Sequence, residues 1–121
     1  LTTSDIKNNI INLSGNVLIQ VSTVIEKGNI NTLANQNNKI INLTNKKCEI
    51  KPNLFIDEYD SSANHSAYIG KFSKEELFYL MSRGLTQKQA TDLLIKGILT
   101  SEINDELLII KINDILKKYW K

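Results

Sequence analysis

A five-residue pattern occurs twice in the first half of this 121-residue chain. Ile-Ile-Asn-Leu-Ser at residues 10–14 recurs as Ile-Ile-Asn-Leu-Thr at residues 40–44, and Gly-Asn-Val at 15–17 recurs as Gly-Asn-Ile at 28–30. Short strands joined by asparagine-rich turns at loose repeats favour a β-solenoid, in which copies of one unit stack on each other. A plain antiparallel meander is a nearly equal alternative, because two imperfect repeats do not distinguish the two folds.

The composition of this half is typical of strands and turns. Of the 15 asparagines, 11 lie within the first 50 residues, among Ile, Val and Thr, which are enriched in strands. Residues 16–22 alternate apolar and more polar side chains, the period of a half-buried strand. Shorter strands are predicted at residues 39–43 and 53–58. The chain begins at Leu1, already inside this pattern, and we therefore expect it to be a piece of a longer protein.

The second half has the periodicity of helices. Ser73–Glu76 and Thr86–Gln89 each match the capping box, in which a hydroxyl and a carboxylate or amide side chain satisfy the first backbone N–H groups. Gly84 and Gly97 are predicted to end the first two helices. A third helix is predicted from about Asn104, with an apolar face formed by Leu108, Ile112, Ile115, Leu116 and Tyr119.

Composition argues against several classes of function. The formal charge of +2, from 15 basic and 13 acidic residues, is too balanced to predict a nucleic-acid-coating protein. No apolar run approaches the roughly 18 residues of a membrane helix. Cys48 is the only cysteine and His65 the only histidine. The chain alone therefore has too few ligands for a zinc site of Cys and His, and any metal site would need a second chain.

Each of these two residues has a structural alternative. His65 lies where the strand pattern gives way to the helical one, and is either a surface or hydrogen-bonded structural residue or a ligand completed by a partner. Cys48 is interpreted as a small buried apolar residue. No Gly-x-Ser-x-Gly motif is present, and neither residue favours nucleophilic catalysis.

Two further patterns suggest functions of other classes. The acidic residues in the segment 57–60 are compatible with a metal-dependent enzyme, but no closing Glu of a calcium loop follows, which favours a solvated turn. Residues 83–90 join two short helices as in a DNA-binding helix-turn-helix. Its second helix offers only Lys88 and Lys96 as cations. A nucleic-acid-binding module is therefore retained as the alternative interpretation.

From His65 onward the sequence is similar to a known family. His-Ser-Ala-Tyr-Ile-Gly at 65–70, Glu-Glu-Leu-Phe-Tyr-Leu-Met-Ser-Arg-Gly-Leu at 75–85, and the segment from Ala90 to Gly97 resemble the C-terminal signature of the SufB/SufD family of iron–sulfur cluster assembly scaffolds. The resemblance begins at about Pro52. It implies a mixed β and α fold, in which the last coils of a parallel β-helix at residues 1–70 precede a small three-helix domain at 71–121.

Within that family the chain looks more like the SufD branch. SufB-like members usually have Glu after the signature histidine, where this chain has Ser66, and SufD-like members usually have Gly. The strand that carries a sulfur-accepting cysteine in SufB-like chains reads Asn-Lys-Ile-Ile at residues 38–41 and has no thiol.

The resemblance also implies a function without catalysis. His65 matches the histidine at the interface with a SufB-like partner, where a nascent iron–sulfur cluster shared by both subunits would bind. The helical domain would dock a SufC-type ATPase through residues drawn from Phe78, Tyr79, Arg83, Gly84, Leu85 and Lys88. Phe78 and Leu80 are expected to be buried, which makes Arg83 and Lys88 the better contact residues. We expect a cytoplasmic protein, or a stromal one in a plastid-bearing organism, whose exposed strand edges also allow homodimers.

Overall fold

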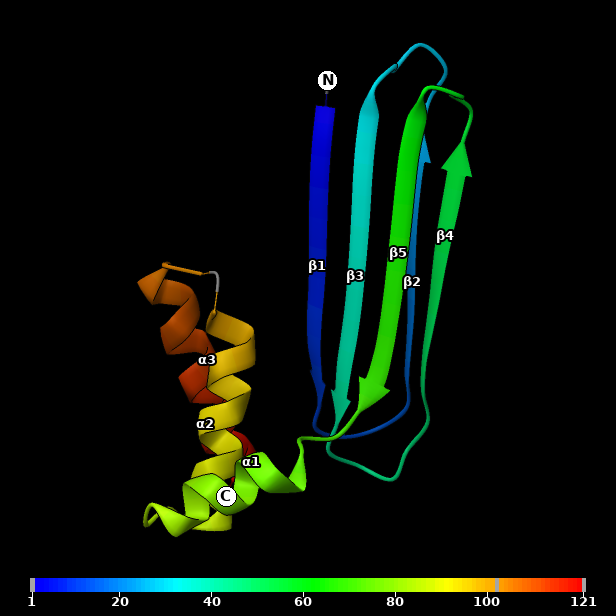
Figure 1. Cartoon of the computed structure of the whole chain (residues 1–121). Helices are drawn as coiled ribbons and strands as arrows, with labels where there is room; N and C mark the ends of the chain where they lie inside the picture. The colour runs from blue at the N-terminus through cyan, green and yellow to red at the C-terminus, as the bar shows by residue number, and fades with distance from the viewer. Residues whose placement is uncertain (1, 102, 121) are drawn as a thin grey trace. The chain divides into compact units, whose positions relative to one another are not determined.

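The computed structural model describes residues 2–101 and 103–120 and divides into two compact units, one ending at Gly70 and the other beginning at Lys71 (Figure 1). The first unit consists of strands and the second of helices. The strands are β1 (Thr2–Asn12), β2 (Val17–Ile25), β3 (Thr32–Asn42), β4 (Cys48–Ile56) and β5 (Ser61–Gly70). The helices are α1 (Lys74–Ser82), α2 (Gln87–Thr100) and α3 (Glu106–Tyr119).

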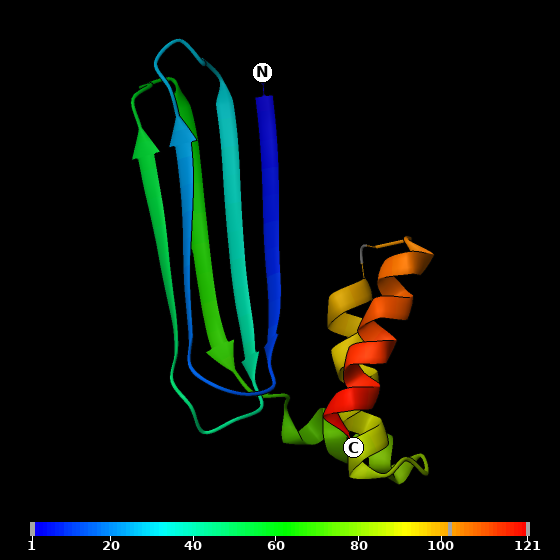
Figure 2. The same cartoon turned by 180° about the vertical axis from the view of Figure 1, so that it is seen from behind.

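The strands alternate between two parallel sheets. One sheet has the order β1-β3-β5 and the other pairs β2 with β4, and the two views show these sheets as separate layers (Figures 1 and 2). Ile10, Ile11 and Asn12 lie in register with Ile40, Ile41 and Asn42, and the repeated sequence segments are therefore neighbours. The antiparallel meander is wrong, because every pairing among the described strands is parallel.

The first and last strands of this unit were not predicted from the sequence. Segments 16–22, 39–43 and 53–58 overlap β2, β3 and β4, but β1 and β5 were not predicted as separate strands. β5 contains Asn, Ala and Gly, which are depleted in strands. It is extended because its backbone pairs with β3 from Ser61 to Gly70. Tertiary pairing, and not local sequence, therefore defines this strand.

The cores of the two units are small and separate. Ile25, Ala34 and Ile40 are buried in the strand unit, and Ile40 is fully inaccessible to solvent. In the helical unit Ala90 and Ile95 of α2 are fully buried, and Leu116 of α3 is 4% exposed. Within the described residues, no helix combines the length and the apolar character that crossing a membrane requires.

The predicted caps position the first two helices. Ser73 Oγ accepts a hydrogen bond from the Glu76 amide at 3.0 Å, but the return bond of the predicted capping box, from the Ser73 amide to the Glu76 side chain, does not form. At α2 both bonds of the capping box are present: Thr86 Oγ1 accepts from the Gln89 amide, and Gln89 Oε1 accepts from the Thr86 amide. Gly84, with φ of +100°, ends α1 as predicted, because an αL residue lets the next amides reach back to the last carbonyls.

Other expectations for the helices were wrong. α2 continues through Gly97 to Thr100, because Gly97 keeps a negative φ and its neighbours supply a helical pattern on both sides. In α3 only Leu116 of the predicted apolar face is buried, whereas Leu108, Ile115 and Tyr119 are exposed. The described part of the unit has too few helices to cover a face this wide.

Gly97 provides a test of the α2 boundary. A Cβ at Gly97 would meet no atom within 4 Å, and Gly97→Ala is expected to raise the free energy of unfolding by about 0.5–1 kcal/mol because alanine loses less backbone entropy in a helix. Urea titration measures this change. The same substitution at Gly84, whose φ is +100°, should lower stability by about 1 kcal/mol. Equal effects at the two glycines would contradict the observed helix ends.

Candidate functional site

His65 lies near the middle of β5, one of the two edge strands of the three-stranded sheet, and its side chain is exposed. Its register partner on the neighbouring strand is Gln36, which is only 2% exposed. Register partners on parallel strands project from the same face of the sheet. His65 therefore projects from the same face of the sheet as the buried Gln36, but at the exposed edge.

A buried polar network includes Gln36, the register partner of His65. Asn38, 1% exposed, accepts a hydrogen bond from Asn8 Nδ2 at 2.8 Å and donates through Nδ2 to Gln36 Oε1 at 2.8 Å. Gln36 Nε2 in turn donates to Thr23 Oγ1 on β2 at 2.9 Å. The network thus joins both sheets. Because buried polar groups are costly unless they are paired, this chain of bonds holds the strands beside His65 in one arrangement.

A side-chain ladder on the opposite face fixes the register of β5. Asn64 Nδ2 donates to Asn35 Oδ1 at 3.2 Å, and Asn35 Nδ2 donates to Asp5 Oδ1 at 2.9 Å. Ser66 Oγ donates to Asn37 Oδ1 at 2.7 Å. The residues on both sides of His65 are therefore bonded to β3. A shift of β5 by one residue would break these bonds and turn His65 to the other face.

Cys48 belongs to a different part of the strand unit. It begins β4, is half-buried, and its Sγ lies 3.3 Å from Asn12 Nδ2. The same Asn12 amide also donates to Gly15 O at 2.9 Å and to Asn42 Oδ1 at 3.2 Å. Cys48 therefore packs into a hydrogen-bonded cluster at the strand turns, whereas His65 lies in mid-strand. Its half-burial differs from the full burial expected from the sequence, because the turn leaves one side open.

The acidic segment at 57–60 forms a turn. Glu58 Oε1 accepts from the Gly28 amide at 3.0 Å, Glu58 Oε2 accepts from the Asp60 amide at 3.4 Å, and the Glu58 carbonyl accepts from Ser61 Oγ. Glu58 is thus committed to joining two loops. Throughout residues 2–101 and 103–120, no three His, Cys, Asp or Glu side chains gather in a way that could hold a metal ion.

The end of α1 exposes aromatic surface. Phe78 is 75% exposed and Tyr79 55% exposed, which corrects the expected burial of Phe78; the partly buried Leu80 projects from another face of the same short helix. Arg83 donates from Nη2 to Tyr79 Oη at 3.0 Å and lies 5.1 Å from the Tyr79 ring centroid. We call Phe78, Tyr79 and Arg83 the α1 surface. Leu85 is only half-exposed and follows Gly84 in the turn.

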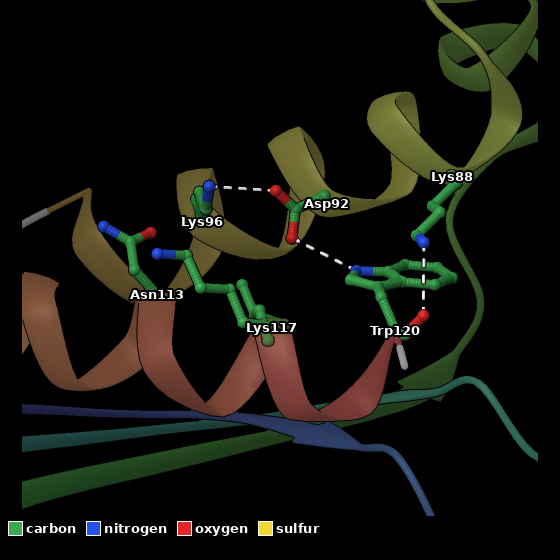
Figure 3. Close-up of a pocket in the computed structure, with 7 residues that line it drawn as sticks. Lys88, Asp92, Lys96, Asn113, Lys117 and Trp120 are labelled. Carbon is green, nitrogen blue, oxygen red and sulfur yellow. Dashed lines mark hydrogen bonds and ion pairs between the residues drawn. The ribbon is translucent and has the colours of Figure 1, made fainter.

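Lys88 is engaged within the helical unit and lies apart from the α1 surface. Its Nζ donates to the Trp120 carbonyl at the end of α3 at 3.2 Å and lies 5.3 Å from the Trp120 ring centroid (Figure 3). Lys96, the other cation considered for a DNA-binding helix, pairs with Asp92 at 2.9 Å. Lys88 therefore joins α2 to the end of α3, whereas Lys96 forms an ion pair within α2. Sequence reasoning missed the role of Trp120, although it is the only tryptophan in the chain.

The sequence of the chain matches the model of a known protein family. The model described as "SUF system FeS cluster assembly, SufBD core domain" matches residues 2–98, from β1 into α2. The chain belongs to the SufBD family. The match includes the polar network, His65 and the α1 surface, and the resemblance found in the sequence is confirmed. Association with iron–sulfur cluster assembly follows from membership of this family.

Individual SufBD relatives agree with the family assignment. An iron–sulfur cluster assembly SufBD family protein of Pyrococcus horikoshii is 39% identical over 101 residues, covering 78% of this chain and 23% of that protein. SufD of Bacillus subtilis is 37% identical over 82 residues, covering 67% of this chain and 19% of the relative. SufB of the same species is 45% identical over 38 residues, covering 31% of this chain and 8% of the relative. The chain thus spans less than a quarter of each of these relatives.

Proposed function

We propose that this SufBD chain is a non-catalytic, SufD-like scaffold segment, and that its strands are the last coils of a parallel β-helix. Hydrogen-bonded side chains on adjacent strands are 30 residues apart between β1 and β3 and 29 apart between β3 and β5. A sequence period of 20–50 residues with stacked strands is typical of solenoids. Alternation of successive strands between two parallel sheets supports the same architecture.

The helical unit docks a SufC-type ATPase through the α1 surface. The observation that carries this part of the proposal is the exposure of Phe78 and Tyr79 beside Arg83. Aromatic residues and arginine are the residue types that dominate binding energy in protein interfaces. The hydrogen bond between Tyr79 and Arg83 restricts both side chains before docking, which lowers the entropy lost on docking. Gly84 and Leu85 form the adjoining turn. Lys88, in the first turn of α2 after it, bonds to the end of α3 and so fixes the position of α2.

The edge of the strand unit contributes to a cluster-assembly interface with a SufB-like partner. His65 is exposed on the edge strand β5. Among the described strands only β3 pairs with β5, and the backbone groups on the other side of β5 can therefore pair with another chain. A neutral imidazole nitrogen can bind iron. The nascent cluster is the cargo of this interface, and further ligands would come from the partner. The same open edges would pair two copies when the partner is missing. We place this assembly in the cytoplasm, or in the stroma of a plastid.

Substitution of Phe78 tests the docking proposal. Phe78→Ala is expected to weaken binding of a SufC-type ATPase about 30-fold, the effect of losing roughly 2 kcal/mol at an interface hot spot. Isothermal titration calorimetry with the 121-residue chain measures this. Leu107→Ala is the matched control, because Leu107 is an apolar residue of α3 that is 70% exposed. The docking surface is wrong if the two variants bind the ATPase equally well while both stay folded by circular dichroism.

A further inference from the structure

A groove between α2 and α3 lies apart from the α1 surface. Its volume is about 650 Å³, and it is lined by Lys88, Asp92, Lys96, Asn113, Leu116, Lys117 and Trp120. Side chains from both helices point toward it (Figure 3). We call it the α2–α3 groove. Lys88, Asp92 and Lys96 of α2 are four positions apart and lie on one face of the helix. The eight residues from Lys88 to Lys96, at a rise of 1.5 Å each, give the groove a length of about 12 Å.

The charge of the groove is positive. Its one carboxylate, Asp92, is already satisfied, because Oδ2 lies 2.9 Å from Lys96 Nζ and Oδ1 accepts from Trp120 Nε1 at 3.3 Å. The side chain of Lys117 makes no hydrogen bond or ion pair with any other described residue. The lining thus has three lysines and one carboxylate, and because Lys96 pairs with Asp92, Lys88 and Lys117 supply the excess positive charge. This balance favours an anionic ligand and disfavours a cation.

The groove also has an apolar floor. Leu116 lies at its base and is 4% exposed. The Trp120 indole forms one end, where it is held by Asp92 and by the Lys88 ammonium 5.3 Å from the ring centroid. A purely ionic ligand would leave Leu116 and the indole unused. A ligand that carries carboxylates on either side of an apolar group matches both the charges and the floor.

We propose that the α2–α3 groove binds a short acidic segment of a partner protein in an extended conformation. Four residues at about 3.3 Å each span the estimated length of the groove. Carboxylates would lie near Lys117 at one end and near Lys88 at the other, with an apolar side chain against the Trp120 indole. This binding site is additional to the proposed ATPase docking, and either can exist without the other.

Trp120 fluorescence tests the proposal directly, because it is the only tryptophan of the chain. The 121-residue chain is titrated with a capped pentapeptide, Asp-Glu-Leu-Glu-Asp, while calorimetry follows the same titration. We expect saturable binding that weakens as salt is added. A peptide in which Asn and Gln replace Asp and Glu should bind at least tenfold more weakly. Absence of saturable binding by both methods, or equal binding of the two peptides, overturns the proposal.

Matched variants and a phosphate arm complete the experiment. Lys117→Gln should weaken the acidic peptide three- to fivefold, as expected for loss of one partly exposed ion pair. Lys111→Gln, at an exposed position of α3 outside the groove, should leave binding unchanged. Equal effects of the two substitutions contradict the site.

Inorganic phosphate and pyrophosphate should bind more weakly than the peptide. If either binds as tightly and changes Trp120 fluorescence alike, the groove is a small-anion site and the peptide proposal fails.

Discussion

Asn38→Ala is expected to lower the free energy of unfolding by about 3 kcal/mol. The substitution removes the amide that accepts from Asn8 Nδ2 and donates to Gln36 Oε1 and to the Ser66 carbonyl. Each buried polar group that loses its partner costs about 1–3 kcal/mol. Asn38 is 1% exposed, and water cannot readily replace the missing amide. Urea unfolding followed by circular dichroism measures the loss.

Asn37→Ala is the matched control for this experiment. Asn37 is the same residue type on the same strand, but its side chain is exposed and accepts one bond from Ser66 Oγ. Its loss is expected to cost less than about 1 kcal/mol, as for a single exposed hydrogen bond. A cost for Asn38→Ala no greater than that for Asn37→Ala would show that the buried network does not hold the strand unit together.

His65→Ala is expected to reduce the yield of iron–sulfur cluster by about tenfold or more in an assembly of the full-length protein with a SufB-like subunit and a SufC-type ATPase. Loss of a metal ligand or of a group that supports one typically costs 10–100-fold in affinity or activity. His65 is exposed and forms no part of the core, and its removal should leave the fold and ATPase binding intact. Visible absorbance of the reconstituted cluster provides the measurement.

Ser66→Ala is the control for His65. Ser66 is the next residue on β5, and its hydroxyl bonds to Asn37 on the opposite face of the sheet. Its substitution should leave the cluster yield within about twofold of wild type. Unchanged yield with His65→Ala, or an equal loss with Ser66→Ala, would return His65 to the role of an exposed strand residue.

Parts of β2, β3 and β4 were predictable from alternating apolar side chains and from the repeat, but β1 was not predicted although it contains the first copy of the repeat. Residues 10–12 and 40–42 are identical, and they are register partners. The other repeat was less informative, because Val17 begins β2 whereas Ile30 lies in a turn. β5 could not be predicted locally, since it forms by pairing with β3. Helix starts followed from Ser73 and Thr86, whose capping side chains act over a few residues.

The candidate site was predictable only in part. The resemblance pointed to His65 and to the end of α1, but not to the buried network of Asn8, Asn38, Gln36 and Thr23. The repeat at residues 10–14 and 40–44 has a spacing of 30, and this spacing would have predicted that Asn8 lies beside Asn38. The exposure of Phe78 was not predictable, because an aromatic residue in a helix has the same sequence pattern in a core as at an interface.

Titration of the wild-type 121-residue chain with a SufC-type ATPase tests the central claim most directly. The chain is proposed to be a scaffold segment whose helical unit holds the ATPase, and the α1 surface lies wholly within it. Isothermal titration calorimetry should show saturable 1:1 binding, which weakens when Phe78 is replaced by alanine. No detectable binding by a chain whose circular dichroism shows both strands and helices would contradict the proposed function.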